Sequence, residues 1–241
     1  MKKTVVIGAN GATGRLLVKL LLQKGVEVIA VVRDSDSLAN MDNHHPGLQI
    51  VEADISEISE NELAHYLKEC DTVFSCLGHN LTFKGVFGHP RRLVTNAVKK
   101  VVQAIESIDS KNKVKIILMN TAGNSNRDIA EKPPFSQTII ISLLRVLLPP
   151  HSDNENAADF LRLKVGQHHE KIEWVAVRPD GLIDDDEVSN YEIVTSPIRN
   201  VIFNAGSTSR INVADFMSDL AIDPELWDEW KGKMPVIYNH A

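Results

Sequence analysis

Three glycines near the N-terminus have the spacing that a phosphate-binding loop requires. They follow a short apolar segment and precede a helical pattern, in the run Ile7-Gly8-Ala9-Asn10-Gly11-Ala12-Thr13-Gly14-Arg15. In such a loop the first glycine permits a tight turn, the second lets the backbone approach a pyrophosphate, and the third lets helix and strand pack closely. The phosphates would lie at a helix N-terminus, where free N–H groups and the helix dipole favour anions. Glycines also mark plain turns, but the flanking strand and helix patterns agree, so we predict a dinucleotide-binding loop.

The residue that ends the second apolar segment predicts which cofactor this loop binds. Arg33 lies nineteen residues after the last glycine of the loop, where dinucleotide-binding folds contact the adenosine ribose. Arginine offers donors to a 2′-phosphate and favours NADP, whereas an acidic residue would suit NAD. Asp34 weakens this inference, Ser35 could add a phosphate donor, and Arg33 could instead stack on the adenine. We favour NADP over NAD, and we expect Asp54 and Ile55 to hold the adenine edge.

The elements that must position these residues alternate between strands and helices, which predicts a parallel sheet with helices on both faces. Predicted strands are 4–7, 26–32, 49–51, 72–76, 114–119, 174–177 and 235–238, and predicted helices include 14–24, 91–108 and about 212–221. We expect one doubly wound α/β domain (a Rossmann fold) over residues 1–241, with three α-β-α layers. A small C-terminal appendage, about 184–241, would cover the substrate side or serve as a structural cap. The apolar helix of the insertion 133–150 could line a pocket or pack a dimer, but we expect it to fill core.

Composition and charge exclude several classes of protein. The 241 residues are 43% hydrophobic and 24% charged, with a net charge of −6, which fits a soluble globular protein and argues against a general nucleic-acid binder. The most apolar stretch, 139–148, is too short to span a bilayer. Two isolated cysteines form neither a disulfide framework nor a metal site. We expect a cytoplasmic monomer or homodimer that acts on a small molecule, with no metal and no membrane or nucleic-acid partner.

Together these motifs resemble the atypical short-chain dehydrogenases, most of all their NAD(P)H-binding, NmrA-like branch, which includes flavin and biliverdin reductases. The resemblance covers about residues 3–183, and more weakly 209–220. It rests on the glycine loop, the Arg33 strand end, Glu52-Ala53-Asp54, Cys76-Leu77-Gly78 and Val177-Arg178-Pro179. It implies that Cys76, Leu77 and Gly78 border the nicotinamide ribose and that Thr121 and Ala122 approach the nicotinamide. We also assign Asn120 and Pro179 to the cofactor, although Asn120 and Thr121 could simply terminate a strand.

The chain differs from ordinary short-chain dehydrogenases at the residue that donates a proton to the substrate. Ordinary short-chain dehydrogenases pair a Ser or Thr with Tyr-x-x-x-Lys, whose tyrosine protonates the carbonyl oxygen. None of the three tyrosines here has that spacing, and Phe160 stands in the tyrosine position before Lys164, unless Phe160 is core and Lys164 is solvated. Thr121 and His79 are the remaining catalytic candidates, because His79 follows Gly78 near the expected nicotinamide. A polar role in the loop is the alternative for His79.

The missing tyrosine limits the kinds of acceptor that the protein could reduce. Reduction of an isolated ketone produces an alkoxide that needs a proton donor or an oxyanion site. A flavin or quinone takes hydride into a delocalised anion that water protonates afterwards, so orientation supplies most of the rate. We therefore expect an NADPH-dependent oxidoreductase of a small conjugated acceptor such as a flavin or quinone. The alternative is a non-catalytic NAD(P)-binding redox sensor that acts through a protein partner; an epimerase is disfavoured because that chemistry needs the missing tyrosine.

Overall fold

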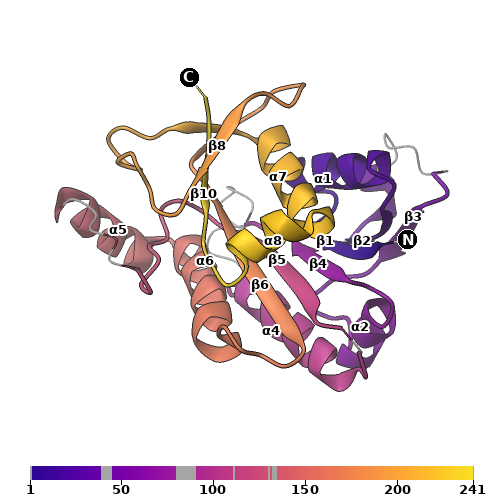
Figure 1. The fold of residues 1–241 in the computed structure, drawn as a ribbon. Helices are drawn as coiled ribbons and strands as arrows, with labels where there is room; N and C mark the ends of the chain where they lie inside the picture. Colours follow the sequence, from indigo (N-terminus) through magenta and orange to yellow (C-terminus); the bar gives the residue numbers. More distant parts are fainter. Residues whose placement is uncertain are drawn as a thin grey trace.

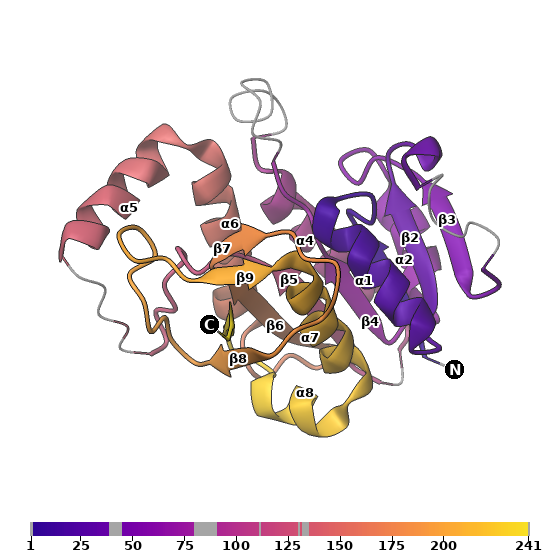
Figure 2. The same cartoon turned by 90° about the horizontal axis from the view of Figure 1, so that it is seen from above.

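The computed structural model describes residues 2–38, 45–79, 91–110, 112–129, 131 and 135–240. A central sheet carries helices on both faces, which gives the expected three-layer α-β-α arrangement (Figures 1 and 2). The strands are β1 Lys3–Ile7, β2 Glu27–Val32, β3 Leu48–Glu52, β4 Thr72–Ser75, β5 Val114–Met119, β6 Ile172–Pro179, β7 Gly181–Ile183, β8 Tyr191–Val194, β9 Ser207–Ser209 and β10 Val236–Asn239. The α-helices are α1 Ala12–Gln23, α2 Glu60–Leu67, α4 Leu93–Ser107, α5 Phe135–Leu147, α6 Pro149–Phe160, α7 Arg210–Ile222 and α8 Pro224–Trp230, with a 3₁₀ turn at Ser35–Leu38 and a π-helical turn at Leu161–Val165.

The order of the strands in the sheet determines where a ligand can bind. The order is β3-β2-β1-β4-β5-β6-β10-β8, and β1 pairs in parallel with both β2 and β4. The chain therefore winds outward in one direction from β1 to β3, and in the other direction from β4 to β6. At such a switch point the loops after the two central strands part and leave a crevice at the carboxyl edge. The doubly wound fold is confirmed, and we therefore expect the ligand crevice at the carboxyl ends of β1 and β4.

Two apolar cores separate the layers. Alternating residues of β1 divide between them, because successive side chains of a strand point to opposite faces of the sheet. Val5 and Ile7 belong to the core under α2, α4 and α6, whereas Val6 belongs to the core under α1, α7 and α8. The continuous apolar runs from which we predicted buried strands lie in these two cores.

The C-terminal part contributes to the sheet as well as to the appendage. β10 pairs in parallel with β6, and β8 pairs antiparallel with β10. The short strands β7 and β9 form a separate parallel pair. Helix α7 packs against α1 over the sheet (Figure 1). The segment after β6 therefore both extends the sheet and covers one of its faces.

The expectation that the apolar insertion helix fills core is wrong for one face of α5. Ile141 is buried, but Ile139, Leu143 and Leu147 are 53%, 55% and 53% exposed. These three residues recur every fourth position and so share one side of the helix. Figures 1 and 2 show α5 at the margin of the molecule, where only its inner side meets the body. Residues 133 and 134 of the insertion lie outside the described part of the chain.

Candidate functional site

The glycine loop has the close backbone packing that its spacing predicts. Gly8 has a φ of +80°, and a Cβ there would lie 2.9 Å from the backbone carbon and oxygen of Cys76. A Cβ on Gly14 would lie 2.2 Å from the carbonyl oxygen of Gly8. Both distances are shorter than any real Cβ contact, so glycine is required at both positions. The loop is held between the end of β4 and the first turn of α1.

The N-terminus of α1 is open toward the loop. Its N-cap is Gly11, which has no side chain to satisfy the N–H groups of the first turn. A Cβ on Gly11 would lie 3.2 Å from the carbonyl oxygen of Gly8, a tight but not impossible contact. Free first-turn N–H groups together with the helix dipole bind anions. The loop therefore fits a pyrophosphate.

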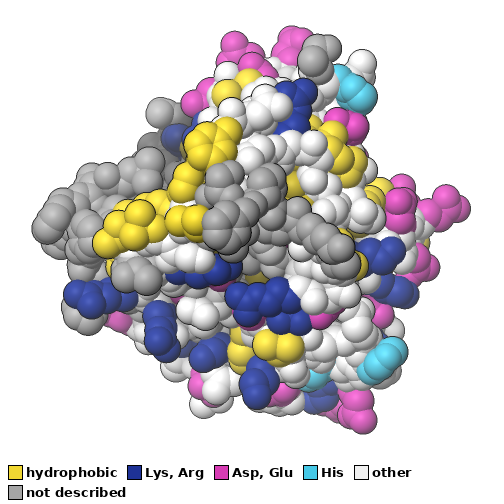
Figure 3. Space-filling view, turned by 90° about the vertical axis from the view of Figure 1, so that its left-hand side faces the viewer, with side chains coloured by type: hydrophobic (Ala, Val, Ile, Leu, Met, Phe, Trp, Pro, Cys, Tyr) yellow, Lys and Arg dark blue, Asp and Glu magenta, His cyan; other side chains and the backbone are white. Residues whose placement is uncertain are grey.

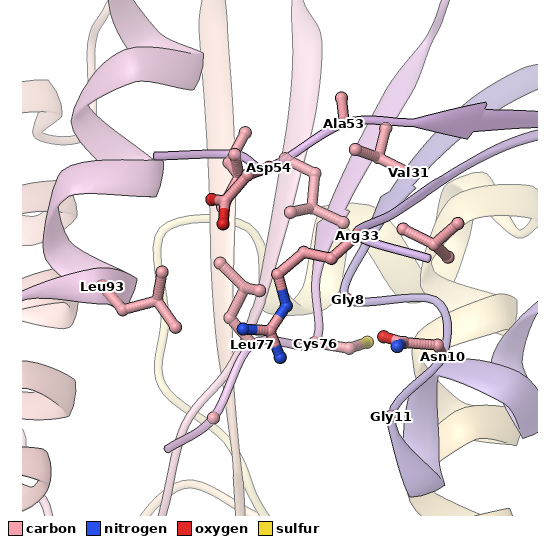
Figure 4. Close-up of a pocket in the computed structure, with 14 residues that line it drawn as sticks. Gly8, Asn10, Gly11, Val31, Arg33, Ala53, Asp54, Cys76, Leu77 and Leu93 are labelled. Atoms are coloured by element: carbon pink, nitrogen blue, oxygen red, sulfur yellow. The ribbon is translucent and has the colours of Figure 1, made fainter. Parts of the chain in front are cut away.

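A pocket of about 310 Å³ opens beside this loop at the switch point of the sheet (Figure 4). Its floor and walls come from the ends of β1, β2 and β4, from the segment after β3 and from the start of α4. The lining residues are Ile7, Gly8, Asn10, Gly11, Val31, Val32, Arg33, Ala53, Asp54, Ile55, Cys76, Leu77, Gly78 and Leu93. The lining combines apolar side chains with backbone polar groups and the polar side chains of Asn10, Arg33 and Asp54.

Two charged side chains, Arg33 and Asp54, line the pocket. Arg33 extends its guanidinium into the pocket and Asp54 lies at its opposite rim (Figure 4). Asp54 Oδ1 accepts hydrogen bonds from the backbone N–H (2.8 Å) and hydroxyl (2.6 Å) of Ser56. The hydrogen bond from the Ser56 hydroxyl, with a smaller contribution from the Arg33 charge, holds the pKa of Asp54 below its usual value despite partial burial. Asp54 is therefore an anion that can accept a hydrogen bond from a ligand.

Ser35 is hydrogen-bonded to a neighbouring carboxylate. Its hydroxyl donates to Glu52 Oε2 at 2.6 Å, and its backbone N–H donates to the same oxygen at 3.2 Å. The hydroxyl bond is the main reason that the pKa of Glu52 is lowered. A 2′-phosphate next to Arg33 would therefore meet the Glu52 carboxylate near Ser35, and Ser35 can serve a phosphate only if this bond breaks.

The cysteine in the pocket wall is not a nucleophile. Burial raises the pKa of Cys76 to about 12, and burial does the same for Cys70 on the other side of the sheet. Both are free thiols. Because the thiolate is the reactive form, neither side chain carries covalent chemistry at neutral pH. Cys76 thus contributes shape and apolar surface to the pocket.

The residues after β5 form a turn that is tied to its surroundings. Asn120 Oδ1 accepts from the backbone N–H of Thr121 (2.9 Å), and its amide donates to the carbonyl of Asn154 in α6 (2.9 Å). The Ala122 N–H donates to the carbonyl of Pro179 (2.9 Å), and the Ala122 side chain packs against β10. Asn120 is therefore bound to α6 and Ala122 to Pro179, while the Thr121 hydroxyl oxygen accepts the Gly123 N–H at 3.3 Å.

His79 forms a buried pair with Asp153. Its Nε2 lies 2.8 Å from Asp153 Oδ2, and both side chains are almost fully buried. The Asp153 carboxylate also accepts the backbone N–H groups of Val94 (2.8 Å) and Thr95 (3.0 Å) in the first turn of α4. Burial alone would raise the pKa of Asp153, but the hydrogen bonds, led by that of His79, lower it. The pair ties the segment after β4 to α4 and α6, which is compatible with a polar role in the loop; the catalytic role of His79 stays a prediction.

Phe160 is not placed where a catalytic tyrosine would stand. It ends α6, contacts the core on the α4 side and lies under the ammonium of Lys99, 5.6 Å from the ring centroid. The start of α6, rather than its end, lies beside β5, as the Asn120–Asn154 bond shows. Phe160 follows His151 by nine positions along the helix, which is about 13.5 Å at 1.5 Å per residue. The Phe160–Lys164 spacing is therefore not a remnant of the catalytic pair.

Nine of the residues assigned to the cofactor line the pocket: Gly8, Asn10, Gly11, Arg33, Asp54, Ile55, Cys76, Leu77 and Gly78. Five others belong to the loop but not to the pocket wall: Ala9, Thr13 and Gly14 are buried, and Ala12 and Arg15 are exposed. Asn120, Ala122 and Pro179 lie outside this pocket, so their contacts with a cofactor stay predictions. The same holds for the catalytic roles of Thr121 and His79, which also lie outside it. Sequence reasoning missed Ile7, Val31, Val32, Ala53 and Leu93; strand ends and a helix start were the available signals.

The three tyrosines lie on three different elements. Tyr66 lies on α2, Tyr191 donates its hydroxyl to Asp215 at 3.0 Å, and Tyr238 is buried on β10. Within the described ranges, no three His, Cys, Asp or Glu residues gather closely enough to hold a metal ion. No helix in those ranges combines the length and apolar character needed to cross a membrane.

Comparison with known proteins indicates the same class of ligand, a dinucleotide, as the glycine loop does. A sequence profile of the NAD(P)H-binding family matches residues 8–224. An uncharacterized chloroplastic protein of Arabidopsis thaliana is 45% identical over 56 residues, which are 23% of this chain and only 20% of the relative's length.

Solved structures share the fold at low sequence identity. An anaerobilin reductase of Escherichia coli O157:H7 has a TM-score of 0.67 at 16% identity and covers 99% of this chain and 97% of its own. A short-chain dehydrogenase/reductase of Veillonella parvula, in complex with NADP, has a TM-score of 0.67 at 15% identity (99% and 94% covered). An NADH-flavin reductase candidate of Streptococcus pneumoniae has a TM-score of 0.65 at 18% identity, with both chains fully covered.

The glycine loop, the pocket at the switch point and the profile match over most of the chain lead to one conclusion. The chain belongs to the NAD(P)H-binding family and has the fold of the atypical short-chain dehydrogenases.

Proposed function

We propose that the protein is an NADPH-dependent reductase that transfers hydride to a small conjugated acceptor such as a flavin or quinone. The observation that carries this proposal is the makeup of the β5 end. Thr121 follows β5, the neighbour of strand β4 whose end lines the pocket. Tyr66, Tyr191 and the Phe160–Lys164 pair lie on other elements, and Tyr238 is buried in the cluster that contains Ala122. A site without a strong proton donor suits an acceptor whose reduced form is a delocalised anion. The flavin and bilin reductases among the fold neighbours are consistent with this class.

The preference for NADPH rests on Arg33. Its guanidinium enters the pocket (Figure 4), and a guanidinium can hold a 2′-phosphate with two hydrogen bonds. Glu52, bound to Ser35, opposes this preference through its charge. We expect the charge-assisted bonds of Arg33 to dominate, because such bonds are about twice as strong as neutral ones.

When bound, the dinucleotide would supply the hydride; the chain's residues would orient it. The free N–H groups of α1 would hold the pyrophosphate, Asp54 would accept from the adenine edge, and Leu77 and Gly78 would border the nicotinamide ribose. The bond between Asn120 and α6 keeps the β5 turn in place. Proximity and fixed orientation are worth several powers of ten in rate.

The test is steady-state oxidation of NADPH and NADH with FMN, menadione and a bilin, beside acetone and benzaldehyde. We expect NADPH oxidation with at least one conjugated acceptor, a lower KM for NADPH than for NADH, and almost no rate with the simple carbonyl compounds. Brisk reduction of acetone by the native protein would contradict the mechanism, because it would require a proton donor that we have not identified.

One observation favours the alternative of a non-catalytic sensor. The exposed face of α5 presents Ile139, Leu143 and Leu147, and hydrophobic side chains form a band on the side of the molecule that carries this helix (Figure 3). Apolar bands on a protein surface often bind partners. A protein that binds NADPH and oxidises it with no acceptor in the panel would support the sensor. The cytoplasmic location and the oligomeric state stay predictions.

A further inference from the structure

A groove runs along α4 and is separate from the dinucleotide pocket, with which it shares no lining residue among those that the structure describes. Two adjoining cavities of about 320 and 340 Å³ form it, since Lys99, Phe160 and Lys164 line both. One wall is α4 from Arg92 to Glu106, and the other is the end of α6 with the turn that follows. The α4 wall extends about 21 Å at 1.5 Å per residue. An extended peptide of about six residues, at about 3.3 Å each, has the same length.

The groove carries three cations although the chain as a whole is acidic. The net charge of the chain is −6, yet Arg92, Lys99 and Lys164 are exposed in the lining. None of the three forms an ion pair with another described residue, and Lys99 lies over the ring of Phe160, 5.6 Å from its centroid. Figure 3 shows Lys and Arg side chains gathered below the hydrophobic band, on the side of the molecule that carries α5. The groove therefore attracts anions.

The two carboxylates that line the groove already have partners. Asp159 lies 3.2 Å from a guanidinium nitrogen of Arg127 and 3.1 Å from one of Arg162, so its charge is balanced. Glu106, at the far end of α4, lies 3.2 Å from His169 Nε2. A ligand in the middle of the groove therefore meets an excess of positive charge.

Apolar and amide groups in the groove suit a peptide. Phe160 supplies an aromatic ring, and Leu163 is 62% exposed. Asn156 on α6 and Gln103 on α4 line the two walls, and their amides make no hydrogen bond with another described residue. An amide both donates and accepts hydrogen bonds, as a peptide backbone requires. A phosphate ion would use neither the apolar side chains nor the amide carbonyls.

The turn after α6 is a second indication of a ligand. Leu161–Val165 is a π-helical turn, a rare conformation that occurs frequently at functional sites. It carries Leu163 and Lys164, and both side chains are exposed in the groove. The helix thus continues past α6 and supplies the groove with one apolar and one cationic side chain.

We propose that this groove binds a short acidic segment of a partner protein. Carboxylates of the segment pair with Arg92, Lys99 and Lys164, and an apolar side chain between them packs on Phe160 and Leu163. Complementary charge selects such a partner and speeds its association, whereas each exposed ion pair adds little affinity. Binding is therefore weak and falls with ionic strength. The proposal goes beyond the proposed reductase function and does not depend on it.

The test uses fluorescence polarisation of two labelled peptides of equal length, an acidic one of Glu and Leu and a basic one of Lys and Leu. The groove variant combines Lys99→Glu with Lys164→Glu. The matched control combines Lys19→Glu with Lys68→Glu and so changes the net charge equally; both lysines are exposed, and neither lines the groove. For each protein we would also measure the melting temperature, the Kd of NADPH, and the binding of phosphatidylserine vesicles and of tripolyphosphate.

We expect the native protein to bind the acidic peptide and not the basic one, and to lose this binding at about 0.5 M salt, where exposed charges are screened. The groove variant should bind the acidic peptide about tenfold or more weakly, since two attractions become repulsions, and it should gain binding of the basic peptide. The control should change by less than about threefold, and the Kd of NADPH should stay native in both proteins.

Several results would overturn the proposal. One is a native protein that does not bind the acidic peptide at low salt. Another is an equal loss in the groove variant and the control, which would show a general effect of net charge. A groove variant that melts like the native protein but gains no binding of the basic peptide would also overturn it. Tighter binding of the vesicles or of tripolyphosphate than of the acidic peptide would assign the groove to a lipid surface or a phosphate instead.

Discussion

The packing of Gly14 against the loop gives a prediction whose size follows from the structure. In an ordinary helix, Gly→Ala stabilises the protein by up to about 1 kcal/mol. At position 14 the new Cβ would lie 2.2 Å from the carbonyl oxygen of Gly8, whereas ordinary contact begins at 3.4 Å. The loop or the helix must therefore move by about an ångström, and such overpacking costs about 1–3 kcal/mol. We expect a net loss of about 1–2 kcal/mol, which lowers the melting temperature by about 3–6 °C in a chain of this size.

The same displacement should weaken cofactor binding, because it moves the N-terminus of α1 away from the pyrophosphate. At a cofactor concentration of about 100 times the Kd, binding stabilises the native protein by about 2.7 kcal/mol. A tenfold weaker variant gains only about 1.4 kcal/mol at the same concentration. The assay is thermal and urea unfolding of Gly14→Ala with and without NADPH, and the NADPH-induced stabilisation should be about half that of the native protein.

Gly25→Ala separates the two effects. Gly25 has a φ of +74° and no atom within 4 Å of an added Cβ, so alanine there costs about 1–2 kcal/mol through backbone strain alone. It lies at the far end of α1 from the loop, so the full NADPH-induced stabilisation should remain. A Gly14→Ala protein that melts no lower than the native one and keeps the full NADPH effect would refute this account of the loop.

Four further predictions concern single residues. Arg33→Ala should weaken NADPH binding by about 1.5–3 kcal/mol in calorimetry and NADH binding much less; equal losses would mean that Arg33 stacks on the adenine. The hydrogen bonds that lower the pKa of Asp153 against burial stabilise the fold fully above the unfolded-state pKa of about 3.9, and this contribution disappears as the pH falls through the lower folded-state value. Stability of the native protein should thus decline in acid, and Asp153→Asn should flatten that decline in urea unfolding at stepped pH. Arg178→Met should cost about 3–5 kcal/mol in urea unfolding, because it leaves the buried Glu131 carboxylate, 2.8 Å from the guanidinium, unpaired; adding Glu131→Gln should restore part of the loss. Phe160→Tyr should give no reduction of acetone, since Phe160 packs against the core on the α4 side under Lys99, and measurable turnover would place it at the nicotinamide after all.

Features that depend on neighbouring residues were predictable from the sequence. The observed strand β5 has the predicted bounds, and β1 differs by one residue, because a strand buried on both faces is a local run of apolar residues. The glycine loop was predictable for the same reason, since turn, phosphate approach and helix packing all constrain residues 8–14. The fold class followed from the alternation of these elements.

The short elements were not predictable in this way. Strands β7 and β9 have three residues each, and β8 is only half-buried, so their apolar pattern is too short to read. Helix α5 shows the opposite failure. Its apolar residues occur on every side, and the sequence cannot say which side will meet the body of the protein and which will stay exposed.

The sequence by itself determined the buried parallel strands and the glycine loop, whereas tertiary structure decided which polar groups meet around the pocket that they form. His79 meets Asp153 across 74 residues, and Arg178 meets Glu131 across 47. The register of α6 against β5 brings His151, and not Phe160, toward Thr121. These encounters depend on how separately formed elements dock, and side-chain spacing within any one element does not record that geometry. Most residues that form the pocket lie at strand ends, which the local sequence pattern locates. The residues that line the groove along α4 become neighbours only after the helices have packed.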